Sequence, residues 1–327
     1  MTARQDAPRI IGDPPTAVRP GFELAPDAVR LMLTARSLPR TMELLGLEER
    51  DRRELSDLLP RVVADDELLA AVTEIANLLR REAGLDARPA PLEDHAERLN
   101  ALQERVEPGQ GLIIILAHLV STDVVRHWHQ ARGLSEQESW LALSDLGQQM
   151  RVHRGTYGEL GHHTIGWTAL NWTGRLFWLG RLQFDLDRAE DTDSWRIGTH
   201  IPATGPLTPA LVDDSFAQAQ QFFAARFGDL AGPSGRFGRE FVCHSWLINA
   251  ELPRILGENS NLGAFAARWQ IERTFGADDD AVFFVFNRRP PYDAAQLPRD
   301  TRLRDAIVER LLDGRGWTGG TGSLPLA

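Results

Sequence analysis

His200 closes a short predicted strand and stands just before a loop rich in proline and glycine. Side chains alternate along Trp195–Ile201, as is typical of a strand, and this places Arg196, Gly198 and His200 on one face. Histidine titrates near neutral pH, so His200 could act as a general base on an amine without further tuning. Gly198 would leave room beside it for a substrate backbone or a thioester. In the alternative interpretation, His200 only braces the loop.

The loop from Pro202 to Leu207 leads into a predicted helix that begins near Pro209. A loop that enters a helix N-terminus presents several backbone N–H groups in a small pocket. Such a pocket suits a phosphate or a pyrophosphate. The strand, the loop and the helix are followed by further strands, and this order of elements suggests a fold that handles acyl-CoA.

A second group of reactive side chains consists of Cys243, His244 and Ser245 on another predicted strand. Alternation puts Cys243 and Ser245 on one face, and His244 and Trp246 on the other. His244 therefore points away from the thiol, and a cysteine nucleophile would need another base, such as His200. Alternatively, Cys243 is a small core residue. Ser245 is a candidate hydrogen-bond donor to a thiolate or a carbonyl.

Polar side chains alternate with apolar ones along a third predicted strand, Arg175–Asp187. Arg181, Gln183 and Asp185 share its polar face and could line a channel for the acceptor or for a pantetheine arm. Asp185 is then a second candidate base. In both interpretations we expect a half-exposed strand, and the alternative is that its polar face meets only solvent or a neighbouring domain.

Composition excludes several classes of function. The 327 residues carry a formal net charge of −10, and an acidic chain is a poor ligand for nucleic acid. There is no lysine, which rules out a Walker-type phosphate loop, a pyridoxal Schiff base and a lysine nucleophile. The single cysteine rules out an intrachain disulfide framework and a cysteine-rich zinc site. Apolar runs such as Leu112–Leu116 are far too short to cross a membrane, and we expect a cytoplasmic protein with no membrane contact.

The histidine pairs and a glycine-rich motif near the C-terminal end are not expected to form a metal site or a dinucleotide site. His127 and His129 lie two residues apart, so they diverge on a helix, and His162–His163 falls in a glycine-rich loop. A zinc site needs three or four converging ligands, and we expect no metal. The G-x-G-x-x-G at Gly314–Gly319 follows a helix rather than a strand, so it is no dinucleotide site. We interpret it as a flexible C-terminal lid.

The pattern changes from helical to strand-rich near Gly174. Predicted helices fill residues 25–107, 111–133 and 135–154, and a capping box opens at Ser135 with Glu138. Later elements are expected at 195–201 (strand), 209–223 (helix), 240–248 (strand), 252–256 and 260–265 (helices), 268–275 and 281–286 (strands) and 302–312 (helix), with a hairpin turn at 191–194. We therefore expect a loose tail (1–24), a helical domain (25–173), a mixed domain (174–290) and a C-terminal helix with a glycine-rich tail (291–327).

Five phrases together resemble a bacterial family: Leu179-Gly-Arg-Leu-Gln-Phe184, Thr199-His-Ile-Pro202, Gly205-Pro-Leu207, Cys243-His-Ser-Trp-Leu247 and Ser260-Asn261. These are acyltransferase domain-containing proteins with a helical N-terminal domain and a GNAT-like C-terminal domain. The resemblance extends from roughly residue 25 to residue 286. It implies an α+β fold, in which the helical domain precedes a GNAT-like mixed α/β domain with a central, mostly antiparallel sheet.

The resemblance also implies acyl-CoA or coenzyme A as the donor. The cofactor pyrophosphate would sit on the matching loop, held by Ile201, Ala203, Thr204, Gly205 and Leu207. Asn261 would touch the adenosine end, and Arg181, Gln183, His244 and Trp246 would line the acceptor side. The loop departs from the usual pattern, because it has one glycine and Pro206 lacks an N–H.

The function expected on these grounds is transfer of an acyl group from acyl-CoA to an amine, or a similar nucleophile, of a small molecule. His200 would remove the proton, and strand N–H groups would polarise the carbonyl. The atypical loop keeps two alternatives open. One is a non-catalytic binding or regulatory protein on the same scaffold, and the other is a related acyl-thioester enzyme, a decarboxylase or a hydrolase.

Overall fold

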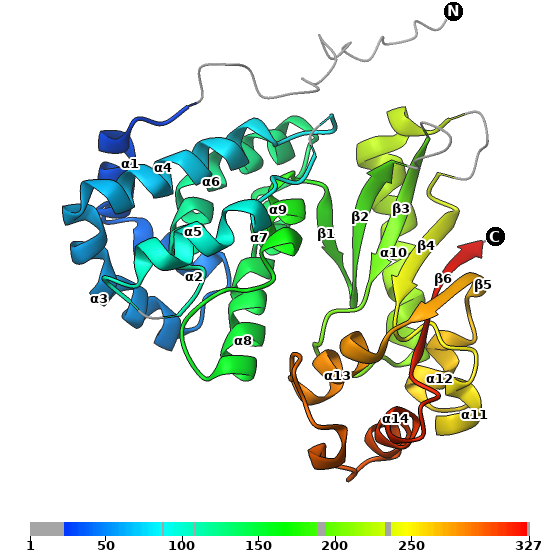
Figure 1. Ribbon diagram of the computed structural model, residues 1–327. Coiled ribbons are helices and arrows are strands. Elements are labelled where there is room, and N and C mark those ends of the chain that lie inside the picture. The colour runs from blue at the N-terminus through cyan, green and yellow to red at the C-terminus, as the bar shows by residue number, and fades with distance from the viewer. Residues whose placement is uncertain (1–22, 87, 108, 189–193, 233–236, 326–327) are drawn as a thin grey trace, which may run out of the picture.

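The computed structural model describes residues 23–86, 88–107, 109–188, 194–232 and 237–325. Within these residues the first half of the chain is helical and the second half is built on one six-stranded sheet (Figure 1). The last helix of the first half ends at Trp172, and the first strand begins at Leu176.

The first half packs its helices around α6, whose residues from Leu112 to Thr122 are all buried. This helix contacts α1, α4, α5, α7 and α9. The helices are α1 (Pro26–Leu33), α2 (Leu38–Leu44), α3 (Glu49–Ala64), α4 (Asp66–Arg81), α5 (Glu93–Gln103), α6 (Leu112–Ala131), α7 (Glu136–Leu143), α8 (Asp145–Tyr157) and α9 (Ile165–Trp172).

The capping box at Ser135 and Glu138 is confirmed, since each side chain accepts a hydrogen bond from the other's backbone N–H. The helix that follows is shorter than predicted. It ends at Leu143, and α8 starts at Asp145 after a break at Ser144.

The second half contains a sheet in the order β1-β2-β3-β4-β6-β5, in which only β3 and β4 run parallel. Its α+β architecture with a mostly antiparallel sheet confirms the predicted fold class. The elements are β1 (Leu176–Leu179), β2 (Leu182–Arg188), β3 (Trp195–His200), α10 (Pro209–Phe227), η1 (Gly228–Leu230), β4 (Glu240–Ser245), α11 (Leu252–Leu256), α12 (Asn261–Ala266), β5 (Gln270–Gly276), α13 (Asp278–Phe286), η2 (Ala294–Gln296), α14 (Arg302–Leu312) and β6 (Thr318–Pro325).

Helix α10 covers one face of the sheet and contacts β1 and β2. Phe216 of α10 packs between Phe184 of β2 and Phe241 of β4, with ring centroids 5.6 and 5.0 Å away. The helical half lies beside β1 in Figure 1, and Gln183 of β2 bonds to Asp145 of α8 on the face opposite to Phe184. Both faces of β2 are therefore buried.

The prediction of a single half-exposed strand at Arg175–Asp187 is wrong in two respects. Arg175–Asp187 is a hairpin rather than a single strand, because Gly180 adopts a positive φ of 69° and turns the chain between β1 and β2. The polar face of β2 is also buried rather than half exposed, since Gln183 and Asp185 are 1% and 7% exposed. The predicted turn at 191–194 lies, except for Ser194, outside the described residues.

Two predictions near the C-terminal end are also wrong. Residues 281–286 form helix α13 rather than a strand, and three aspartates, Asp278 to Asp280, fill its first turn, where acids favour a helix N-terminus. The segment interpreted as a lid contributes strand β6, which pairs with β4 and β5 inside the sheet. The strand around Cys243 ends at Ser245 rather than at Ile248.

Candidate functional site

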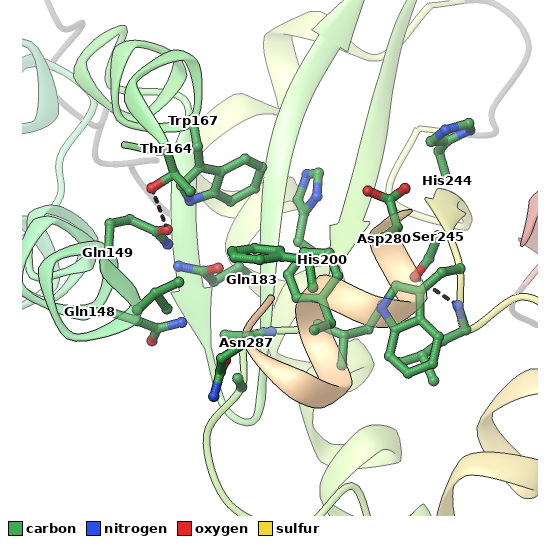
Figure 2. Close-up of a pocket in the computed structure, with 18 of the residues that line it drawn as sticks. Gln148, Gln149, Thr164, Trp167, Gln183, His200, His244, Ser245, Asp280 and Asn287 are labelled. Atoms are coloured by element: carbon green, nitrogen blue, oxygen red, sulfur yellow. Dashed lines mark hydrogen bonds between the residues drawn. The ribbon is translucent and has the colours of Figure 1, made fainter. Parts of the chain in front are cut away.

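A pocket of about 270 Å³ lies between the helical half and the carboxyl ends of β3 and β4 (Figure 2). The parallel strands β3 and β4 are paired only at Ile197–Phe241 and Gly198–Val242. Beyond this point they separate, and the gap between them opens into the pocket. The lining residues come from α8 and α9 (Gln148, Gln149, Val152, Thr164, Trp167), from the strands and their ends (Gln183, Thr199, His200, Ile201, Pro202, Ala203, His244, Ser245, Trp246, Leu247) and from α13 and beyond (Asp280, Phe283, Phe284, Asn287, Arg289).

His200 and Asp185 form a hydrogen-bonded pair at the base of this gap. The Nε2 atom of His200 lies 2.8 Å from Oδ1 of Asp185, and the two side chains are 30% and 9% exposed. An ionised carboxylate can only accept, so the proton lies on Nε2 and Nδ1 keeps its lone pair. This tautomer leaves Nδ1 as the nitrogen that could take a proton from a bound nucleophile.

Gly198 makes this pair possible. Asp185 lies opposite Gly198 in the register of β2 and β3, and a Cβ atom at Gly198 would lie 2.0 Å from Oδ1 of Asp185. The space that we expected a substrate to use is therefore filled by the Asp185 carboxylate. Only glycine leaves room for it.

A second carboxylate, that of Asp145 at the start of α8, is fully buried. Its Oδ1 accepts a 2.7 Å hydrogen bond from Nε2 of Gln183, and its Oδ2 accepts one of 2.7 Å from Nε1 of Trp167. Burial raises the pKa of Asp145, and these donors oppose the shift. The Trp167 ring in turn lies edge-on to the His200 imidazole, with centroids 4.6 Å apart.

The loop from Pro202 to Leu207 keeps the position predicted for it, between β3 and α10. Among its backbone N–H groups, that of Thr204 donates to Pro202 O at 2.8 Å. Within the described part of the chain, those of Ala203, Gly205 and Leu207 donate to no protein acceptor. The cap of α10 follows at Thr208.

Arg181 holds the other side of this loop. Its Nε donates to Pro206 O and its Nη2 to Gly205 O, each at 3.2 Å. The backbone N–H of Arg181 donates to Oγ of Ser215 in α10 at 2.7 Å. Arg181 therefore ties the hairpin tip to the loop instead of lining an acceptor channel with Gln183.

The structure separates Cys243 from the pocket. Its side chain is 2% exposed and belongs to the hydrophobic core beneath α10, and burial raises the pKa of the thiol. A buried neutral thiol is a poor nucleophile, so the structure contradicts this candidate role. Ser245 does line the pocket, where its Oγ accepts from the N–H of Leu247 at 3.1 Å.

The remaining candidates on β4 and α12 differ in their position. His244 lines the pocket wall, stacks on Phe275 with centroids 4.0 Å apart, and lies 2.8 Å from Thr321 through Nδ1. Trp246 also lines the pocket. Asn261 is exposed at the start of α12, after the cap residue Ser260, and does not line the pocket.

Several pocket residues were missed by the sequence analysis. Asp280 and Arg289 supply charge, and Phe283 and Phe284 supply aromatic surface, but α13 was predicted as a strand. Gln148 from α8 was missed because nothing local distinguishes it from other helical amides. Its Oε1 is buried and, among the described residues, has no hydrogen-bond partner, which is the situation of a group that contacts a ligand.

Four histidines of the helical half, His118, His153, His162 and His163, lie close together. Nδ1 of His153 lies 3.1 Å from Nδ1 of His163, and Nε2 of His162 lies 2.7 Å from the Thr168 hydroxyl. Burial lowers the pKa of His118, His153 and His163 to about 4, so these rings are neutral at pH 7. Among the residues described, no group of three or more His, Cys, Asp or Glu side chains could hold a metal ion.

No described helix is both long enough and apolar enough to cross a membrane.

Residues 36–174 match the family model of the N-acyltransferase N-terminal domain, and residues 176–324 match that of the GNAT-like C-terminal domain. No curated protein matches the chain.

Among solved structures, an acyltransferase in complex with decanoyl-CoA and teicoplanin is similar with a TM-score of 0.73 at 24% sequence identity, over 93% of this chain and 100% of that one. A mutant acyltransferase in complex with octanoyl-CoA gives the same values. An acyltransferase in complex with decanoyl-CoA is similar with a TM-score of 0.66 at 25% identity and the same coverage. The fold described above is thus shared with these proteins along almost the whole chain.

Proposed function

The chain belongs to the N-acyltransferases that join an N-acyltransferase N-terminal domain to a GNAT-like C-terminal domain, and on this premise we propose that it transfers an acyl group from acyl-CoA to an amine of a small molecule. The observation that carries the proposal is the His200–Asp185 pair, which stands where β3 and β4 separate. The solved relatives that bind octanoyl-CoA, decanoyl-CoA and coenzyme A support the choice of donor.

His200 acts as the general base. Asp185 orients the imidazole and stabilises the positive charge that forms when Nδ1 takes a proton from the attacking amine. The amine nitrogen bonds to the thioester carbonyl carbon, and the C–S bond breaks to release the CoA thiolate. The protonated His200 then gives its proton to the thiolate, directly or through water, so that CoA leaves as a thiol and the imidazole is neutral again. Ser245, at the end of the neighbouring strand, is placed to donate a hydrogen bond to that sulfur or to the carbonyl oxygen.

The donor lies along the gap between β3 and β4. Pairing between the two strands stops at Gly198 and Val242, so the backbone groups beyond can bond to a pantetheine arm as a further strand would. The pyrophosphate is met by the N–H groups of Ala203, Gly205 and Leu207 and by the N-terminus of α10. Ile201 and Thr204 would complete this donor site, and Asn261, exposed at the start of α12, would contact the adenosine end.

The acceptor enters from the helical side. Gln148 and Gln183 offer amide groups there, whereas His244 and Trp246 form the opposite wall. A small molecule fits the pocket volume of about 270 Å³, which is closed on one side by α8 and α9.

The test combines binding and turnover. Calorimetric titration with CoA, acetyl-CoA and decanoyl-CoA measures donor affinity, and a thiol reagent measures CoA release when amines are added. The only cysteine is buried, so the protein contributes little background to this assay. Release that depends on an amine supports acyl transfer. Release without an amine identifies a thioester hydrolase instead, and binding without release identifies a non-catalytic scaffold.

A further inference from the structure

Asp145 is a buried carboxylate without a cationic partner. It is 0% exposed, and no arginine or histidine of the described chain forms an ion pair with it. Its polar contacts are with Gln183, Trp167 and Gln149, all neutral donors. A buried carboxylate held only by neutral groups costs stability, and such groups are found where function requires them.

The donors around Asp145 face it in a fixed orientation. The hydroxyl of Thr164 donates to Oε1 of Gln149 at 2.8 Å, as Figure 2 shows. The amide nitrogen of Gln149 is thereby turned toward Asp145 and lies 3.3 Å from its Oδ2. Trp167 offers only an N–H. Donors on both carboxylate oxygens favour the ionised form.

Each strong contact of Asp145 leads to His200. Nε1 of Trp167 donates to Oδ2 of Asp145 at 2.7 Å, and the Trp167 ring lies edge-on to the imidazole, with centroids 4.6 Å apart. Nε2 of Gln183 donates to Oδ1 of Asp145 at 2.7 Å, and Gln183 is the residue opposite His200 in the register of β2 and β3. Asp185, two residues beyond Gln183 on the same face of β2, holds Nε2 of His200. The carboxylate therefore links the first turn of α8 to the ring that packs on the imidazole and to the residue of β2 that lies opposite His200.

We propose that Asp145 is a positioning residue of the acyl transfer reaction, which fixes Trp167 and Gln183 around His200 and supports the positive charge on the imidazole from the helical half. The proposal rests on the role of His200 given above. It assigns to the helical half a part in the reaction itself, besides shaping the acceptor side of the pocket. Asp145 touches neither donor nor acceptor, and it acts through its neighbours.

The principal test is Asp145→Asn, which keeps the size of the side chain and removes its charge. We expect kcat to fall roughly tenfold to a hundredfold, because displacement of a reacting group by about 1 Å has an effect of this order. The KM for acyl-CoA should stay within about twofold, since the donor loop is untouched. The Tm should be equal or higher, because burial raises the pKa of Asp145 and its ionised form is therefore a cost to the native state.

Asp51 provides a matched control. It is also a buried aspartate of the helical half, 1% exposed, but it pairs with Arg154 (2.8 Å from Nε to Oδ1) and does not line the pocket. Asp51→Asn should lower the Tm and leave kcat unchanged. A lowered kcat with an equal or higher Tm in Asp145→Asn, against a lowered Tm with an unchanged kcat in Asp51→Asn, would distinguish a positioning role from structural support.

Trp167→Phe gives a second measurement, because it keeps a ring beside His200 and removes the N–H. If Asp145 acts through Trp167, the loss of kcat in the double variant should be smaller than the product of the two single losses. A wild-type kcat in Asp145→Asn would overturn the proposal, as would a loss of kcat that merely follows a lowered Tm. If His200→Ala were fully active, the proposed function would fail instead, so the two failures are distinguishable.

Discussion

Gly198 and Asp185 face each other across β3 and β2 so closely that a Cβ atom at Gly198 would lie 2.0 Å from the Oδ1 atom. The same Cβ would lie 3.4 Å from Nε2 of His200. Because Gly198 has no side chain, the Asp185 carboxylate on β2 has the space to reach the His200 imidazole on β3.

Gly198→Ala should therefore behave as a variant of Asp185. The carboxylate must move, the hydrogen bond to His200 is lost, and overpacking costs about 1–3 kcal/mol of unfolding free energy. We expect kcat to fall together with the Tm. The control is Gly155→Ala on α8, where a Cβ meets nothing within 4 Å and should stabilise the helix by about 0.5–1 kcal/mol with normal kcat. Wild-type kcat in Gly198→Ala would contradict the role of the pair.

His200→Ala should lower kcat by about 10²–10⁴-fold, the usual contribution of a general base. Affinity for acyl-CoA should change little, because the donor site proposed above consists of backbone groups of the strands and the loop. Thiol release measures kcat, and calorimetry measures affinity. His95→Ala, on the helical half outside the pocket, serves as the control. Unchanged turnover in His200→Ala would remove His200 from the mechanism.

Arg181 should govern donor binding rather than the chemical step. Arg181→Ala frees the carbonyls of Gly205 and Pro206, and each lost hydrogen bond is worth about 0.5–1.5 kcal/mol. We expect KM for acyl-CoA to rise roughly threefold to a hundredfold at nearly constant kcat. Arg181→Lys should recover only part of the affinity, because an ammonium group cannot reproduce the two-carbonyl geometry. A lower kcat at unchanged KM would contradict this division of roles.

Cys243 should be unreactive in the native protein. Its thiol is buried in the core and its pKa is raised, so thiol reagents should label it only after denaturation. Cys243→Ala is expected to retain kcat while it loses about 1 kcal/mol of unfolding free energy. Mass spectrometry after labelling checks the first point. Rapid labelling of the folded chain, with loss of turnover, would restore the nucleophile hypothesis.

The buried histidines predict a loss of stability in mild acid. Burial lowers the pKa of His118 and His129 to about 4, below the value of about 6.5 in an unfolded chain. The unfolded state therefore binds more protons between these values, and the stability present above pH 6.5 is lost as the pH falls toward 4. At pH 5 the loss is on the order of 2 kcal/mol for each fully buried ring. Urea unfolding at pH 7.5 and pH 5 measures it, and equal free energies would contradict the assignment.

Local patterns were sufficient to predict β3, the loop at Pro202 and helix α10, because side-chain alternation and a proline in the first turn are short-range signals. His200, Asp185 and Ser245 were each identified in this way. Their mutual arrangement was not predicted, because the contact of Asp185 with His200 depends on the register of β2 against β3.

Other features depended on tertiary context. Strand β6 is rich in glycine and has little intrinsic preference for a strand, but Gly320 and Gly322 pack where a Cβ would meet backbone oxygens at 2.6 and 2.8 Å. Asp145 carries no local signal at all. Its importance comes from Trp167 and Gln183, which folding brings to it from α9 and β2.

The place of β6 has a consequence for the biosynthesis of the protein. Residues 318–325 are the last described element of the sheet along the chain, yet they lie between β4 and β5. During translation, helices α1 to α9 could collapse around α6 while the rest of the chain is still being made. The sheet cannot close until β6 has emerged, so the nascent chain exposes the unpaired edges of β4 and β5 until residues 318–325 are synthesised. Protection of these edges by a chaperone should therefore matter most in the interval between the synthesis of β4 and that of β6.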